Sequence, residues 1–417
     1  MKLIQHAACF LLIAGFSVSG ISQEIDRPIQ TLTLQQAIER ALANYPAHQI
    51  QRYAIEQALG QKTTAGLLPN PVLSYYREDL KFGGLKGGEE IFSAALPLNF
   101  LWNRWSQVNA ANAQIEAENI SLANVQRLIK FEAQKAFVEC YYATQSYQAW
   151  QKAGKVFQQA ATVGKIRLTD GDISGYEQQR IALEHQRYQK ATIEAQAEFT
   201  NSRRRLAFFL DPAQSEVRFE PIDEFQLSTA EINLEKLLAQ AKQNRPDLQA
   251  ARATLRSRQA ALSTARWQQL PMTSVSGGYK KQVDGFKGAV IQVNLGFPLF
   301  DRNQGEVRSA RAFLEQQIWA ADLLENQVAL EVRQAYDRYR SYREQVNQVL
   351  QANSQTPEQV LQIAQFSYAE GEMSLVELLD GVRAYSEAFQ TRYDLLLKYQ
   401  LSIFELEKAA ATSTADF

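Results

Sequence analysis

The sequence contains few of the residues that bind soft metals or form disulfides. Its 417 residues include two cysteines, three methionines and three histidines. Cys9 lies in an N-terminal apolar segment for which cleavage is expected, so Cys140 would be the only cysteine of the mature chain and could form no intramolecular disulfide. His48 and His185 have no neighbour at metal-ligand spacing. A tightly bound metal held by His, Cys and Met is therefore not expected.

Helix-breaking residues, charge imbalance and catalytic motifs are also scarce. Twenty glycines and eleven prolines are few for this length and favour long, uninterrupted helices. Lys and Arg number 44 against 45 Asp and Glu, so the net charge of −1 gives no electrostatic reason to expect nucleic acid as a partner. The sequence has no H-E-x-x-H, G-x-S-x-G or G-x-x-x-x-G-K-[ST] motif. The chain is therefore not predicted to be an enzyme, and no cofactor is expected.

Long hydrophobic runs are missing beyond the N-terminus. Residues 1–22 are typical of a signal peptide, with Lys2 before an apolar stretch at 7–17 and small residues before Gln23, where cleavage is predicted. A membrane-anchoring helix is the alternative, but the stretch is too short to span a bilayer. A lipoprotein is less favoured because Cys9 lies at the start of the apolar run. The exported chain is therefore expected to be soluble in the periplasm or to cross a membrane as strands.

The mature sequence repeats itself with a period of about 200 residues. Four landmarks recur in the same order: Tyr45-Pro46 and Arg245-Pro246, Leu68-Pro69 and Leu270-Pro271, Leu96-Pro97-Leu98 and Phe297-Pro298-Leu299, and Gly171-Asp172-Ile173-Ser174 and Gly371-Glu372-Met373-Ser374. Each repeat reads as a short helix, a helix, a β-hairpin, a very long helix, a tight turn and a returning helix. The predicted domains are a first repeat at 23–209, a linker at 210–231, a second repeat at 232–410 and a tail at 411–417.

Each repeat contains one predicted β-hairpin. In the second, at about 272–299, apolar residues from Ala289 to Phe297 alternate with mostly polar ones, which gives the strand one apolar face. In the first, at about 72–98, two strands flank a glycine-rich loop at 83–88. Four strands cannot close around water, and an open sheet edge cannot lie in lipid, so membrane-spanning strands would need three chains to form a twelve-stranded barrel. Alternation alone leaves open a second interpretation, in which two small hairpins pack on a soluble helical body.

The helices predicted between these landmarks are longer than those of ordinary globular domains. From 304 to about 351, apolar residues recur every three or four positions over roughly 70 Å, the pattern of a coiled coil or bundle. The counterpart from about 104 to 161 approaches about 90 Å if straight. Returning helices are expected at 174–209 and 374–408. The fold class is therefore mainly α, with long antiparallel coiled-coil helices in two repeats and four strands per chain; a coiled-coil scaffold is the simpler alternative.

The signal peptide, the duplicated halves, the hairpin in each half and the paired helix turns together resemble the outer-membrane efflux protein (TolC-like) family, and most of all its heavy-metal and cation efflux branch. The resemblance covers nearly all of the mature chain. The second turn carries a tyrosine, a glycine and two acidic residues at the family's spacing: Tyr368, Gly371, Glu377 and Asp380. The first turn carries the equivalent glycine and glutamate: Gly171 and Glu177.

This resemblance implies a homotrimer whose twelve-stranded barrel crosses the outer membrane of a Gram-negative bacterium and whose helices form a water-filled tunnel in the periplasm. Such a channel would passively conduct metal cations or small toxic compounds to the exterior. Its implied partners are a periplasmic adaptor and an inner-membrane pump, for which the RND type is one candidate. The side chains implied at the periplasmic aperture are Glu177, Tyr368, Glu377 and Asp380. The turn residues implied to contact the adaptor are Gly171, Asp172, Ser174, Gly371, Glu372 and Ser374.

A ring of carboxylates from several subunits would favour cations at the entrance of such a tunnel. Ordinary solvated helix charge is the alternative for Glu377 and Asp380. A periplasmic coiled-coil adaptor or scaffold is the alternative function for the whole chain.

Overall fold

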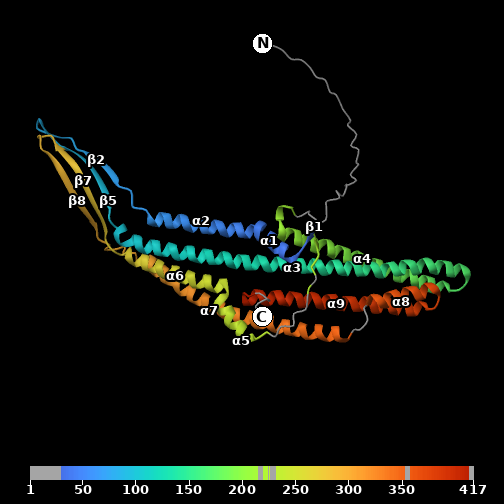
Figure 1. Cartoon of the computed structure of the whole chain (residues 1–417). Helices are drawn as coiled ribbons and strands as arrows, with labels where there is room; N and C mark the ends of the chain where they lie inside the picture. Colours follow the sequence, from blue (N-terminus) through green and yellow to red (C-terminus); the bar gives the residue numbers. More distant parts are fainter. Residues whose placement is uncertain (1–29, 215–218, 224, 226–231, 353–356, 413–417) are drawn as a thin grey trace, which may run out of the picture.

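The computed structural model of the chain describes residues 30–214, 219–223, 225, 232–352 and 357–412. The predicted signal peptide at 1–22 and the part of the predicted tail beyond residue 412 lie outside these residues. The described part is elongated, with a β-sheet at one end, two helix-to-helix turns at the other and long helices between them (Figure 1).

The same order of elements occurs twice along the chain. The first half contains α1 (Leu34–Asn44), α2 (Pro46–Gly66), β2 (Val72–Arg77), β5 (Glu89–Pro97), α3 (Phe100–Asp170) and α4 (Gly175–Leu210). The second half contains α5 (Leu234–Asn244), α6 (Pro246–Trp267), β7 (Met272–Gln282), β8 (Lys287–Gly296), α7 (Gln304–Ala352), α8 (Pro357–Glu370) and α9 (Leu375–Ala410). The 71 residues of α3 span about 105 Å, whereas α7 and α8 divide the corresponding length of the second half.

Local sequence signals explain where the repeated helices begin. Thr33 closes a capping box at the start of α1, and Asn233, 200 positions later, accepts a hydrogen bond from the Lys236 amide at the start of α5. Pro46 and Pro246 occupy the first positions of α2 and α6, where no intrahelical N–H is needed. The two halves therefore start their helices with closely related signals.

The four long strands form one antiparallel sheet in the order β2-β5-β7-β8. The central β5–β7 pair joins the two halves of the chain, and β2 and β8 each keep one unpaired edge. The loop expected at 83–88 is shorter than predicted, because β3 (Leu80–Phe82) pairs with β4 (Leu85–Gly87). The turn between them is formed by Gly83 and Gly84, whose φ angles of 55° and 87° suit glycine.

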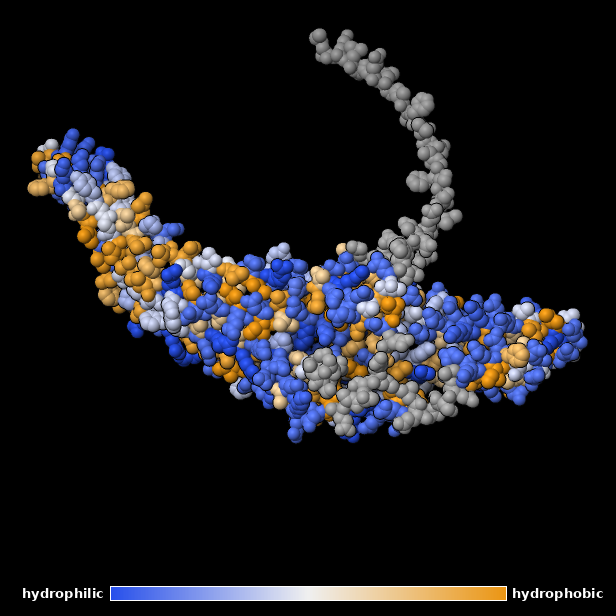
Figure 2. Space-filling view, viewed as in Figure 1, coloured by the Kyte–Doolittle hydropathy of each residue, from blue (hydrophilic) through white to orange (hydrophobic). Residues whose placement is uncertain are grey.

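The sheet has one apolar and one polar face, because residues paired across neighbouring strands point to the same side. The apolar face contains Leu73, Tyr75, Phe92, Leu96, Val275, Tyr279, Ile291, Val293 and Leu295. The other face is more polar and contains Ser74, Ser93, Ser276, Gln292 and Asn294, together with the apolar Val72, Tyr76, Ile91 and Val290. Most of the apolar side chains are exposed, and hydrophobic surface covers much of the sheet in Figure 2. The period-two pattern expected for the second hairpin is therefore present in β7 and β8, whereas in β2 and β5 it is interrupted by Val72, Tyr76 and Ile91 on the more polar face.

The long helices lie side by side in four columns. Their order is α2 with α4, then α3, then α6 with α9, then α7 with α8, so the first and last columns form the edges of the chain. A β-carbon at Gly164 in α3 would come within 2.8 Å of Ile181 in α4, so glycine permits the close contact of these two helices. In the described residues, no helix combines the length and the apolar character needed to cross a membrane.

Two of the columns consist of helices that meet end to end. In the first half Asn44 donates a hydrogen bond to the Leu210 carbonyl at 3.3 Å, and the Tyr45 ring lies 5.5 Å from that of Phe209. In the second half Arg245, at the position equivalent to Tyr45, donates to the Ala409 carbonyl at 3.3 Å. Beside these joints, the parallel pair of β1 (Gln30–Leu32) and β6 (Phe219–Pro221) connects the N-terminal segment to the region between the halves, an element that the sequence did not predict.

Candidate functional site

The two helix turns singled out in the sequence lie side by side at the end of the molecule opposite the sheet (Figure 1). At the α3–α4 turn Gly171 has φ 84°, and the Asp172 amide donates to the Arg167 carbonyl at 2.8 Å. At the α8–α9 turn Gly371 has φ 83°, and the Glu372 amide donates to the Ser367 carbonyl at 2.9 Å. Both helices thus end in the same glycine-dependent motif, in which left-handed glycine lets the next amide bond back to the helix.

The helix that follows each turn begins with a capping box. Ser174 accepts from the Glu177 amide at 3.2 Å, and the Glu177 carboxylate accepts from the Ser174 amide at 2.9 Å. Ser374 and Glu377 repeat the arrangement at 3.3 and 2.8 Å. The hydrogen bonds from Ser374 hold the pKa of Glu377 below its usual value. These four predicted site residues therefore shape the turns themselves, and their contact with an aperture or an adaptor stays a prediction.

The other predicted site residues divide into exposed and buried groups. Asp172, Glu372 and Asp380 are exposed, as are the two turn glycines. Tyr368 is only 4% exposed and packs in a hydrophobic cluster with Leu361 and Leu378, which raises the pKa of its phenol by burial. Its hydroxyl makes no hydrogen bond within the described part of the chain. Tyr368 therefore acts through packing within a single chain, and its place at an aperture stays a prediction.

One residue at this end was missed by the sequence analysis. Arg167, in the last turn of α3, donates hydrogen bonds to the carbonyls of Tyr368 at 3.0 Å and Ala369 at 3.4 Å, both at the end of α8. Its guanidinium also lies 5.0 Å from the centre of the Tyr368 ring. The available signal was a cation four positions before Gly171, where the second repeat has Ser367. Arg167 links the two turns of the chain directly.

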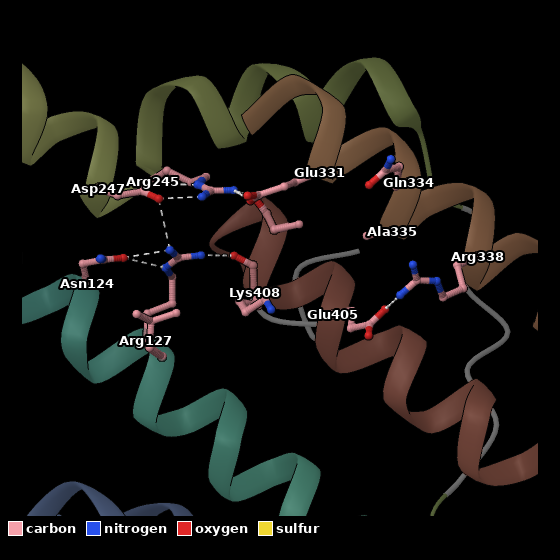
Figure 3. A pocket seen from close by; sticks show the side chains of 12 residues that line it. Asn124, Arg127, Arg245, Asp247, Glu331, Gln334, Ala335, Arg338, Glu405 and Lys408 are labelled. Carbon is pink, nitrogen blue, oxygen red and sulfur yellow. Dashed lines mark hydrogen bonds and ion pairs between the residues drawn. The ribbon is translucent and has the colours of Figure 1, made fainter. Parts of the chain in front are cut away.

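A second polar cluster lies far from the turns, where α9 meets α6, and was also missed (Figure 3). Arg245 has a 4% exposed side chain and donates two hydrogen bonds to Asp247, at 3.0 and 2.5 Å, and one to Glu331 at 2.5 Å. Arg127 reaches from α3 to Asp247 at 3.3 Å and donates to the Lys408 carbonyl. The cluster therefore ties three columns together and satisfies carbonyls at the C-terminal end of α9.

The electrostatics of this cluster are those of a structural network. Burial would raise the pKa of Asp247, but the hydrogen bonds and charge of Arg245, with the charge of Arg127, outweigh it and hold this pKa below its usual value. Burial lowers the pKa of Arg127 and of Lys408. Among the described residues, no group of three or more His, Cys, Asp and Glu side chains is placed to hold a metal ion.

Comparison with known proteins places these features in a family. A model of the Outer membrane efflux protein family matches residues 237–412, which include α6 to α9 and the second turn. The cobalt-zinc-cadmium resistance protein CzcC of Cupriavidus metallidurans is 24% identical over 369 residues, which are 86% of this chain and 84% of CzcC. The predicted resemblance to the cation efflux branch agrees with this match.

Solved structures share the fold along nearly the whole chain. The CmeC outer membrane channel of Campylobacter jejuni superposes with a TM-score of 0.76 at 17% identity, over 90% of this chain and 85% of CmeC. The outer membrane protein VceC of Vibrio cholerae gives a TM-score of 0.70 at 17% identity, over 91% of this chain and 96% of VceC. The family match in the second half and the common fold of both halves agree with each other. Residues 237–412 thus match the Outer membrane efflux protein family, a family of channels, and the fold of the chain is the one seen in outer membrane channels such as CmeC.

Proposed function

We propose that three copies of this efflux channel close into one twelve-stranded barrel in the outer membrane, above a helical tunnel that conducts metal cations passively. The observation that carries the proposal is the amphipathic four-stranded sheet with two unpaired edges. Channel function in a tripartite efflux system follows from the family, whereas the barrel, the trimer, the partners and the substrate are proposed.

The directions of the strands support closure between copies. Each neighbouring pair in the order β2-β5-β7-β8 is antiparallel, so the edge strands β2 and β8 run in opposite directions. The β8 edge of one copy could therefore pair with the β2 edge of the next and continue the antiparallel pattern. Closure would satisfy every edge hydrogen bond, which lipid requires, and would turn the apolar face outward.

The strand count of the barrel supports three copies over two. Two copies would give eight strands, and the interior of an eight-stranded barrel is largely filled by side chains. Three copies give twelve strands and leave room for water inside. The edge columns of helices also carry exposed apolar side chains that a ring of copies would cover: Ile50 and Tyr53 on α2, Leu183 on α4, Trp319 and Leu323 on α7, and Phe366 on α8.

The partners and the substrate are supported by similarity. Efflux channels of this family work with a periplasmic adaptor and an inner-membrane pump, and the exposed turns at Gly171 and Gly371 are the proposed adaptor contacts, with Glu177, Glu377 and Asp380 near the aperture. The name of CzcC refers to resistance to cobalt, zinc and cadmium, which favours divalent metal cations as the substrate class. The alternative of a periplasmic adaptor or scaffold has no support from these matches.

Two neighbouring residues of β8 provide a test with a matched control. Ile291 is 80% exposed on the apolar face, and Gln292 lies on the polar face. Arginine at a lipid-facing site near the bilayer centre costs about 2–4 kcal/mol, whereas a water-filled lumen accepts it. Ile291→Arg is therefore expected to reduce the amount of trimer in the outer membrane, and Gln292→Arg to leave assembly intact and lower the conductance for cations.

The measurement is the yield of detergent-extracted trimer, followed by single-channel recording in planar bilayers with Co²⁺ and Zn²⁺ salts. Equal tolerance of the two substitutions would contradict a lipid-facing sheet. A wild-type chain that is monomeric and water-soluble without detergent would overturn the barrel and the trimer together.

A further inference from the structure

The end of the sheet that lies farthest from the helices changes from apolar to charged. Figure 2 shows hydrophobic surface along the sheet and hydrophilic residues at its tip. On the apolar face, the outermost row that crosses all four strands is charged and consists of Arg77, Glu90, Lys281 and Lys287. The row before it is apolar and mostly aromatic, with Tyr75, Phe92, Tyr279 and Ala289. The change therefore occurs within two residues, about 7 Å along the strands.

The charges of the outermost row do not balance one another. Arg77 lies 3.6 Å from Glu90 and 3.3 Å from Asp79, so its charge is compensated within the chain. Lys281 lies directly opposite Lys287 on the neighbouring strand, and both side chains are exposed. Neither lysine has a carboxylate within 4 Å among the residues that the structure describes. Like charges opposite each other destabilise a strand pair, so these two ammonium groups favour an anion between them.

The adjacent lysine shows that this arrangement is specific to one face of the sheet. Lys280 lies on the more polar face and forms an ion pair with Glu89, and both of these side chains are less than one-third exposed. In the proposed barrel the more polar face surrounds the lumen. The chain thus neutralises the lysine that would face the lumen and leaves Lys281 and Lys287, which would face outward, without an ionic partner of their own.

The position of the two lysines matters more than the total charge of the tip. The tip carries six cationic side chains, which are Arg77, Lys81, Lys86, Lys280, Lys281 and Lys287. It also carries five carboxylates, which are Glu78, Asp79, Glu89, Glu90 and Asp284. With charges so nearly equal, general attraction of the tip for anions is weak. An anion would be selected by the Lys281–Lys287 pair itself, which lies directly beyond the aromatic row.

The proposed barrel determines which anion this pair would meet. Its aromatic row would lie at the boundary of the membrane, where barrels place aromatic girdles, so the next row reaches the level of the lipid headgroups. The helices extend into the periplasm, so this end of the sheet faces the outer leaflet. The main lipid of that leaflet in Gram-negative bacteria is lipid A, a glycolipid with phosphorylated sugars. Two ammonium groups with β-carbons about 5 Å apart can contact the oxygens of one phosphate.

We infer that Lys281 and Lys287 form a binding site for a phosphate group of lipid A on the outer surface of the barrel. The inference rests on the proposed function, because it requires the apolar face of the sheet to meet lipid. The acyl chains of the same molecule would lie along Tyr279 and Ile291, which are 52% and 80% exposed and continue the outward surface toward the helices. Since β8 is an edge strand, the site borders the seam between two copies.

The test measures binding of lipid A to the full-length trimer in detergent, by native mass spectrometry. Replacing both Lys281 and Lys287 with glutamine is expected to weaken binding at least about tenfold, because two charge-assisted contacts are lost. Lys287→Gln alone should give a smaller loss, of about threefold to fivefold. Replacing both lysines with arginine should retain the affinity, since guanidinium groups also bind phosphate. Lys280→Gln is the matched control on the opposite face and should leave the affinity unchanged.

Two further ligands separate a lipid headgroup from free phosphate. Lipid A from which the phosphates have been removed should bind the wild-type trimer about as weakly as intact lipid A binds the variant with two glutamines. Inorganic phosphate at the same concentration should not displace lipid A, because it lacks the acyl chains that contact Tyr279 and Ile291. Equal competition by inorganic phosphate would show a site for free phosphate and would overturn the assignment to a lipid.

The outcomes distinguish the lipid site from the channel itself. If the wild-type trimer and the variant with two glutamines bind lipid A equally, the site is wrong and the channel stands. An equal loss in Lys280→Gln would also overturn the site, because the effect would then be one of general charge. Should the variant with two glutamines fail to assemble, wild-type affinity in Lys287→Gln alone would still reject the site. If the wild-type chain is monomeric and water-soluble, the proposed function fails first.

Discussion

Replacing Arg245 should loosen the C-terminal end of α9 more than any substitution among its exposed neighbours. The Arg245 side chain is 4% exposed and donates to Asp247, to Glu331 and to the Ala409 carbonyl. Arg245→Met keeps the apolar stem and removes every donor. Asp247, whose side chain is 17% exposed, would then keep only Arg127 as a charged partner.

The expected loss of stability in Arg245→Met follows from how deeply each ionic partner of Arg245 is buried. Removing one member of a buried ion pair costs about 3–5 kcal/mol, because the other charge is left without compensation. Arg127 reduces this cost by remaining near Asp247, and the half-exposed Glu331 adds only about 0–1 kcal/mol. We therefore expect the local opening free energy of α9 to fall by about 2–4 kcal/mol, which is about a 30- to 1000-fold loss of protection.

Hydrogen exchange followed by mass spectrometry on the last two turns of α9 measures this quantity directly. Glu331→Gln is the matched control, since it changes the exposed partner of the same guanidinium and should reduce protection less than about fivefold. Unchanged hydrogen exchange in Arg245→Met would refute the reasoning, because it would show that the cluster does not stabilise the end of α9. An equal loss of protection in α4 would also refute it, because the destabilisation would then be global.

Three further predictions concern single residues. The folded-state pKa of Asp247 is depressed, so its stabilising contribution is present at neutral pH and is lost as pH falls below about 3.8. Asp247→Asn should therefore remove this part of the acid dependence of the unfolding free energy. An unchanged dependence of unfolding on acid pH in this variant would contradict the prediction. Gly371→Ala should lower thermal stability by about 1–2 kcal/mol because φ is positive there, whereas Gly60→Ala within α2 should raise it slightly. Ser374→Ala should cost about 1 kcal/mol by removing the cap of α9, measured as faster exchange in its first turn.

Elements that depend on local sequence could be predicted well. The predicted helix at 304–351 corresponds to α7, which ends at residue 352, and the returning helices differ from α4 and α9 by one or two residues at each end. Their periodicity, caps and turn glycines are all local signals, and the repeat presented each signal twice. The first long helix extends further than predicted, to Asp170, because Gly154 and Gly164 lie where α4 approaches closely and do not interrupt it.

Contacts between distant parts of the chain could not be predicted in this way. Arg167 and Tyr368 are 201 positions apart, and neither residue differs in type from an ordinary helix residue. The repeat even gave a misleading signal at the joints, since Tyr45 and Arg245 occupy equivalent positions but make an aromatic contact in one half and an ionic cluster in the other. Side-chain chemistry diverged where the backbone stayed the same, so equivalence in sequence did not imply equivalence in contacts.

The two open edges of the sheet have a consequence for the newly exported chain. Before it meets other copies, a single chain exposes unpaired backbone groups on β2 and β8 together with an apolar surface. Such a surface is prone to aggregation. In the proposed assembly, a low concentration of chains would slow trimer formation and so prolong the aggregation-prone stage after export. The thermal stability of this protein should accordingly rise with protein concentration, because association between copies pairs the sheet edges that a single chain leaves unpaired.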